Sequence, residues 1–172
     1  MLVHGFDMHR VYISAPGDLE AEREACRAVI GETNERLAMP SKVLLVSVGL
    51  PQEGALDQYR AAVADNIRQC RYYIQIFQDD WGPRNLSRKM FYLAYDGRSD
   101  GALPMQEVIV LLKAAPRETD PEILGFRKEL AELSGVQVIS FESIASMQEQ
   151  LRPALAGWAS NIIAAQEPAT TA

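Results

Sequence analysis

The chain has 172 residues, of which 48% are hydrophobic and 23% charged, and its formal net charge is −6. That length suits one domain with a substantial core, and the composition is typical of a globular protein. The negative charge disfavours nucleic-acid binding, because the longest basic run is Arg88–Lys89. No apolar stretch could span a membrane and the N-terminus lacks an apolar leader, so we expect no membrane contact and a cytoplasmic location.

Residues that could carry redox or metal chemistry are few. Cys26 and Cys70 fall within helical patterns, and we expect two reduced, buried thiols. No cluster of His, Cys and Asp has the spacing of metal ligands, so no metal site is predicted. Both histidines, His4 and His9, precede the first expected strand, which disfavours a Ser-His triad with Ser14.

The stretch from residue 10 to residue 37 reads as a strand, a tight turn and a helix. The apolar run Val11–Ile13 predicts a strand over 10–14, and residues 1–9 are interpreted as a loose lead-in. A turn follows at Ser14–Gly17, and Asp18 stands where a helix N-cap is expected. Apolar positions repeating at three, four and seven then predict a helix over 19–37.

The rest of the chain continues this alternation of strands and helices. Pro153 is expected to kink or split the last helix, and residues 167–172 are expected to be a disordered tail, so that residues 10–166 form one domain. Further strands are predicted over 42–48, 72–77, 107–113 and 136–141, and further helices over 56–70, 86–95, 121–133 and from 144 onward.

Five apolar strands alternating with helices predict an α/β fold: a flavodoxin-like three-layer sandwich around a five-stranded parallel sheet of order 2-1-3-4-5. The strand order reverses between the first and third strands, and ligands of such sheets bind outside the carboxyl ends at the reversal. Two loops should meet there. The predicted ligand-binding residues are Ser14, Pro16, Gly17, Asp18, Asp79, Asp80, Trp81 and Gly82.

The same two loops carry a family resemblance. The segment VYISAPGDLEAERE resembles the opening of the TIR-like domains of unknown function at the N-termini of bacterial STAND-type NTPases, through Ser14, Ala15, Asp18, Leu19, Glu22 and Arg23. The segment YIQIFQDDWG is similar to the family's third strand and the loop after it. The resemblance covers about residues 10–141 and implies a TIR-like fold, related to TIR domains and nucleoside deoxyribosyltransferase-like proteins.

The resemblance leaves catalysis open. Some of these relatives cleave the N-glycosidic bond of NAD or nucleosides, and the enzymatic ones place a glutamate on the helix after the third strand. Here that helix reads LSRKMFYLAYDG and contains no glutamate. A carboxylate near the anomeric carbon stabilises the positive charge that develops in such a reaction. Asp79 or Asp80 could supply it, although a solvated loop pair or a cap for the next helix is the simpler interpretation of both.

The other singled-out residues also have structural alternatives. Asp18 is an N-cap first and a ligand group second. Trp81 could stack on a base or a nicotinamide ring, but a Trp that covers the sheet edge is commoner. Arg23 could fold back onto a carboxylate at the sheet end or form a helix-surface ion pair with Glu20.

Three functions are therefore carried forward. The first is a non-catalytic TIR-like signalling or adaptor module that acts by protein–protein contacts, including self-association, and needs no cofactor. The second is an N-glycosidase or deoxyribosyltransferase-like enzyme that acts on NAD or a nucleoside. The third is a sensor that binds a nucleotide signal without turnover.

Overall fold

The structure of the chain is a computed structural model that describes residues 2–3, 5–49 and 60–166. One sheet forms its centre, and the parallel strands lie in the order β3-β2-β4-β5-β6, while the two-residue strand β1 pairs antiparallel with the start of β2. Apart from β1, this is the predicted flavodoxin-like order 2-1-3-4-5. The strands are β1 (Leu2–Val3), β2 (Phe6–Ser14), β3 (Val43–Val48), β4 (Tyr72–Phe77), β5 (Glu107–Lys113) and β6 (Val136–Phe141).

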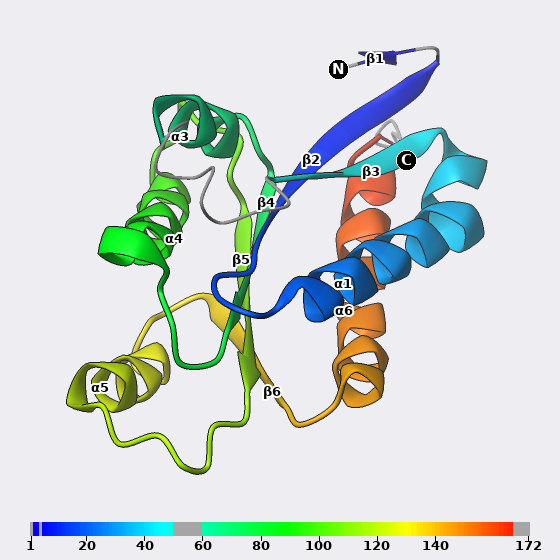
Figure 1. Cartoon of the computed structure of the whole chain (residues 1–172). Coiled ribbons are helices and arrows are strands. Elements are labelled where there is room, and N and C mark those ends of the chain that lie inside the picture. The colour runs from blue at the N-terminus through cyan, green and yellow to red at the C-terminus, as the bar shows by residue number, and fades with distance from the viewer. Residues whose placement is uncertain (1, 4, 50–59, 167–172) are drawn as a thin grey trace.

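The helices cover both faces of the sheet, as Figure 1 shows: α1 and α6 pack on one face, and α3, α4 and α5 on the other. Each face encloses a separate apolar core. Val11, Ile13 and Ile74 belong to the first core, and Tyr12, Tyr73 and Phe77 to the second, as the alternation of side chains along a strand requires. The α-helices are α1 (Glu20–Thr33), α3 (Arg60–Arg68), α4 (Leu86–Gly97), α5 (Pro121–Leu130) and α6 (Ile144–Gln166).

The first long strand begins earlier than predicted. β2 starts at Phe6 rather than at residue 10, so part of the expected lead-in belongs to the sheet. Asp7 and Met8 pair with Val43 and Leu44 of β3, which gives this polar segment a partner strand. Its side chains are only half-buried, and the sequence FDMHR therefore lacks the apolar run by which the other strands were recognised.

The helix α1 also differs at both ends from the prediction. It begins at Glu20 with Leu19 as its N-cap and no capping side chain, so the assignment of Asp18 as the N-cap is wrong. Its end runs into a π-helical turn, η1 (Asn34–Ala38). There the Asn34 amide donates to the Leu45 carbonyl at 2.8 Å and accepts from the Leu45 N–H at 2.9 Å, which satisfies the outer edge of β3.

The later helices agree with the predicted boundaries at the start of α5 and differ from them in α6. Asp120 caps α5, which begins at Pro121 as predicted, and its side chain accepts from Glu122 N at 2.8 Å. The helix α6 continues through Pro153, so the predicted split is wrong. Residues 50–59 and 167–172 lie outside the described part, and with them the first four residues of the predicted helix 56–70 and the predicted tail. No helix that the structure describes combines the length and the apolar character needed to cross a bilayer.

Candidate functional site

The two turns predicted to flank one crevice do meet. β2 and β4 are parallel neighbours, with Val11–Ser14 in register with Tyr72–Gln75, so both strands end on the same side of the sheet. Gly17, at φ +74°, lies against Asp80: a Cβ on Gly17 would come 3.4 Å from the Asp80 Cβ. The predicted juxtaposition is confirmed: the two turns lie beside each other at this point, close enough that a side chain added at Gly17 would touch Asp80.

The predicted site residues differ in accessibility. Ser14 and Pro16 are buried, whereas Gly17, Asp18, Asp79 and Asp80 are exposed. Asp80 is engaged within its own loop, because its Oδ1 accepts from Gly82 N at 2.8 Å. The exposed residues therefore form a surface rim. The hydrogen bond within the loop agrees with the interpretation of Asp80 as part of a solvated loop.

Trp81 belongs to the core rather than to this rim. Its side chain is 4% exposed, and its ring centroid lies 4.2 Å from that of Phe77 and 4.5 Å from that of Phe126. These contacts cover the ring from β4 and from α5, so Trp81 is a packing residue, although it lies in the core and not over a sheet edge as the simpler interpretation expected. A base or nicotinamide ring would have to displace one of these neighbours to stack on it.

Two charged residues of the α1 motif are buried at this end of the sheet. Glu22, with 5% of its side chain exposed, accepts from Lys113 Nζ at the end of β5 at 2.5 Å. Arg23 is 4% exposed and lies under Gly49, where a Cβ would come 2.7 Å from Arg23 Nη2. Burial lowers the pKa of Arg23, and its Nη1 is 4.0 Å from Glu20 Oε2. The expected ion pair with Glu20 is therefore present at this distance, but the Arg23 side chain that forms it is buried and not on the helix surface.

A further arginine, which the sequence analysis did not single out, joins the neighbouring strand ends. Arg127 of α5 donates from Nη2 to Gln78 O at 2.6 Å and to Lys113 O at 2.7 Å, and so links the ends of β4 and β5. Gln78 Nε2 adds a bond to Ala114 O at 3.2 Å. Burial lowers the pKa of Arg127, opposed by the nearby charge of Asp79.

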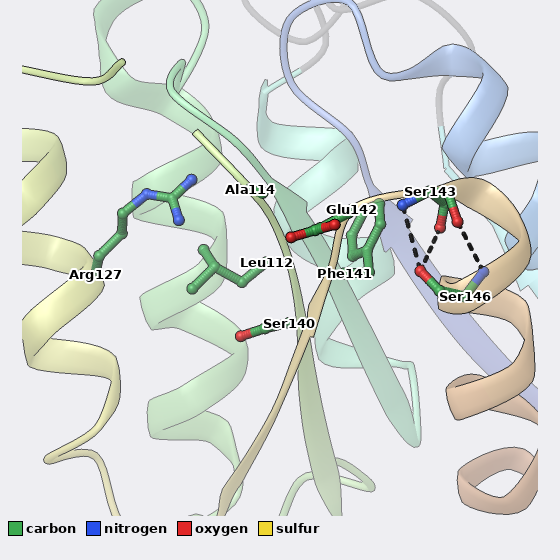
Figure 2. Close-up of a pocket in the computed structure, with 8 residues that line it drawn as sticks. All are labelled: Leu112, Ala114, Arg127, Ser140, Phe141, Glu142, Ser143 and Ser146. Carbon is green, nitrogen blue, oxygen red and sulfur yellow. Dashed lines mark hydrogen bonds between the residues drawn. The ribbon is translucent and has the colours of Figure 1, made fainter. Parts of the chain in front are cut away.

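A cavity of about 560 Å³ opens beside this link, at the carboxyl ends of β5 and β6. Figure 2 shows Arg127 and Glu142 on opposite sides of it, with Leu112 between them. Ser143 and Ser146 exchange hydrogen bonds at the start of α6, where Ser143 Oγ accepts from Ser146 N at 3.2 Å. The cavity therefore lies two strands away from the predicted crevice. The order of strands alone could not indicate it, because it depends on where α5 packs.

The described residues contain no group of three or more His, Cys, Asp or Glu side chains placed to hold a metal ion. Cys26 and Cys70 are both buried thiols, and burial raises the pKa of each to about 12. They belong to the cores on opposite faces of the sheet, which keeps them apart. Neither thiol is available as a nucleophile at neutral pH.

The chain was compared with known proteins and structures. No protein-family model and no curated protein matches it. Among solved structures, it is similar to a fragment of a candidate lipoprotein from Peptoclostridium difficile 630, with a TM-score of 0.46 and 11% identity over 88% of this chain and 97% of that one.

Proposed function

We propose that this chain is a TIR-like signalling or adaptor module that acts through protein–protein contacts, with a second copy of itself among its partners. The proposal rests on how the residues of the predicted crevice, where ligands of such folds bind, are packed and paired. Gly17 lies beside Asp80, Trp81 is packed between Phe77 and Phe126, and Glu22 is engaged by Lys113. Trp81, the one aromatic ring among the predicted ligand-binding residues, is thus committed to the core, and Asp18 and Asp79 remain exposed on the surface.

The helix after β4 supports the same proposal. α4 reads LSRKMFYLAYDG and offers no glutamate for glycosidic cleavage. Asp79 and Asp80 are exposed on the turn, and Asp80 is held by the Gly82 backbone. An exposed carboxylate in water stabilises an oxocarbenium ion less than one in an enclosed site does. A cytoplasmic setting belongs to the proposal, supported by the two unpaired thiols, Cys26 and Cys70.

Exposed apolar side chains point to a surface for such contacts. Of the large apolar residues described as exposed, Leu124 is on α5, Val138 on β6 and Ile144 at the start of α6. Each of these three elements also contributes at least one residue to the lining of the 560 Å³ cavity: Arg127 from α5, Ser140 and Phe141 from β6, and Ser146 from α6. Met39, in the 3₁₀ turn before β3, is the exposed apolar residue outside this group. Apolar exposure gathered on neighbouring elements is typical of interaction surfaces.

Turnover tests the proposal against its first alternative. Purified protein incubated at high concentration with NAD, and separately with deoxynucleosides, is expected to release neither nicotinamide nor base. Release that disappears in the Asp79→Asn or Asp80→Asn variant would replace the adaptor proposal with the N-glycosidase. A melting temperature raised by nucleotides without turnover would favour the sensor instead, since a ligand that binds only the folded state stabilises it.

Self-association tests the surface. Light scattering over a range of concentrations is expected to detect dimers or larger species of the unaltered chain. The double variant Leu124→Glu/Val138→Lys should remain monomeric, and Met39→Lys, the matched exposed control, should associate as before. A monomer at every concentration would remove self-association from the proposal, and equal loss in both variants would remove this surface from it.

A further inference from the structure

The amino ends of the parallel strands carry a second cavity, of about 790 Å³, on the opposite end of the sheet from the two turns. This groove lies where β2, β4 and β5 begin, and α3 forms one of its sides. Its volume is in the range typical of small-molecule sites. Its lining includes Met8, His9, Arg10, Arg71, Leu103 and Gln106.

Backbone hydrogen bonds place two of its arginines side by side. Arg71 N donates to Arg10 O at 3.0 Å, and Gln106 N donates to Arg71 O at 2.8 Å. Arg10, Arg71 and Gln106 therefore stand in one row across three neighbouring chain segments. Because adjacent strands are about 5 Å apart, the backbones of Arg10 and Arg71 are close enough for both side chains to reach one small ligand.

Neutral groups hold both guanidinium groups in place. Arg10 Nη1 donates to Gln69 Oε1 at 2.7 Å, and Arg71 Nε donates to Gln106 Oε1 at 3.0 Å. Within the described residues, neither arginine forms an ion pair with a carboxylate, whereas Arg68 pairs with Asp65 at 3.0 Å. The groove thus orients two positive charges without neutralising them, in a chain whose net charge is −6.

His9 supplies the remaining support for Arg71. Its Nδ1 lies 3.1 Å from Arg71 Nη1, and its Nε2 lies 2.9 Å from Asp7 Oδ2. A guanidinium can only donate, so Nδ1 accepts, and Nε2 carries the proton that it donates to Asp7. Burial lowers the pKa of His9, with the charge of Arg71 acting in the same direction and Asp7 opposing it. The imidazole therefore acts as a neutral spacer that orients Arg71 toward the groove.

We propose that this groove is a binding site for a small molecule that carries a phosphate or carboxylate group, held by Arg10 and Arg71. The bonds described above occupy one nitrogen of Arg10 and two of Arg71, and the Arg71 guanidinium also faces Tyr72, with its Cζ 5.8 Å from the ring centroid. The N–H groups of Arg10 that these bonds leave over, together with the outer edge of Arg71, are the proposed donors to an oxyanion. Arginine forks match the oxygens of both groups. Met8, Leu103 and Pro104 provide an apolar wall for the rest of the ligand. Asp65 also lines the groove, and its carboxylate disfavours highly charged anions.

Calorimetric titration tests the site with inorganic phosphate, pyrophosphate, succinate and citrate as separate probes at low ionic strength. At least one probe is expected to bind with a Kd of about 1 mM or lower, and the double variant Arg10→Gln/Arg71→Gln should weaken that binding at least about tenfold. The matched control, Arg36→Gln/Arg117→Gln, changes the net charge equally at two exposed arginines outside the groove and should bind as the unaltered chain does.

The pattern across the probes identifies the ligand class. Binding of phosphate and pyrophosphate alone assigns a phosphorylated ligand, and binding of succinate and citrate alone assigns a carboxylate. No binding by any probe, or equal weakening in the control variant, would overturn the proposal. Should the double variant fail to fold, Arg10→Gln alone serves, since that side chain is only half-buried. Failure here leaves the adaptor proposal intact, because the two regions lie at opposite ends of the sheet.

Discussion

The two ends of the parallel sheet use charged side chains differently. At the carboxyl end, Glu22 is engaged by Lys113, and Arg127 donates to two backbone carbonyls. At the amino end, Arg10 and Arg71 are held by neutral amides and a histidine. A buried charge that is paired or bonded to strand ends contributes to the fold, whereas the half-buried guanidinium groups at the amino end are oriented without a carboxylate partner among the described residues. The comparison shows that charges at the carboxyl end are neutralised within the fold, while those at the amino end support the binding site proposed there.

Replacing the tryptophan at the carboxyl end should give the largest effect. Trp81→Ala removes a side chain that is 4% exposed and packed against Phe77 and Phe126, and we expect a loss of about 4 kcal/mol in the free energy of unfolding. Urea denaturation measures it, with Trp81→Phe as the milder control because it keeps most ring contacts. A loss below about 0.5 kcal/mol, which is the usual size for a surface substitution, would contradict the core position of Trp81 and favour its role in ligand binding.

Breaking the buried ion pair tests the comparison directly. Lys113→Met leaves the buried Glu22 carboxylate without its cation, and we expect it to cost about 3 kcal/mol of stability. The amino-end counterpart Arg71→Met loses hydrogen bonds to Gln106 and His9 in an open groove and should cost only about 1 kcal/mol.

A double variant separates charge from packing in the same experiment. Glu22→Gln combined with Lys113→Met removes both charges and should recover most of the stability lost in Lys113→Met. The exposed ion pair between Arg152 and Glu32 provides a baseline, and Arg152→Gln should leave the unfolding midpoint unchanged. Equal losses in Lys113→Met and Arg71→Met would erase the distinction between the two ends.

The smallest expected effect is a pH dependence at the amino end. Burial lowers the pKa of folded His9 below its ordinary value of 6.5, so the unfolded chain binds the proton more readily. Stability should therefore be complete above about pH 6.5, where both states are neutral, and should fall as the pH drops toward the folded pKa. Denaturation of the unaltered chain and of His9→Gln between pH 7 and pH 5 measures the difference. If stability rises on acidification in the unaltered chain but not in His9→Gln, the assignment of His9 as a neutral group in the folded state is wrong.

The sequence predicted the central strands from their apolar runs. The runs YYIQIF and EVIVLLK coincide with β4 and β5, because a parallel strand between two helical layers needs few polar side chains. The edge strand β6 was also predicted correctly from VQVISF, although three of its six residues are exposed. The half-buried start of β2 escaped the same reasoning, since its residues pair with β3 while their side chains remain partly solvated. The N-cap at Asp18 was wrong for a related reason: a capping residue type in a turn does not fix where the helix begins.

Chain order and apolar periodicity by themselves determined the sheet and the meeting of the turns at Gly17 and Asp80, because parallel crossovers allow few arrangements of five strands. Only the tertiary structure decided the use of each charge. The residues of each pair come from distant parts of the chain: Glu22 with Lys113, and Arg10 with Arg71. Their partners depend on where α1, α3 and α5 pack against the sheet. Local sequence specifies backbone geometry, whereas the neutralisation of a charge depends on groups that only folding brings within hydrogen-bond distance.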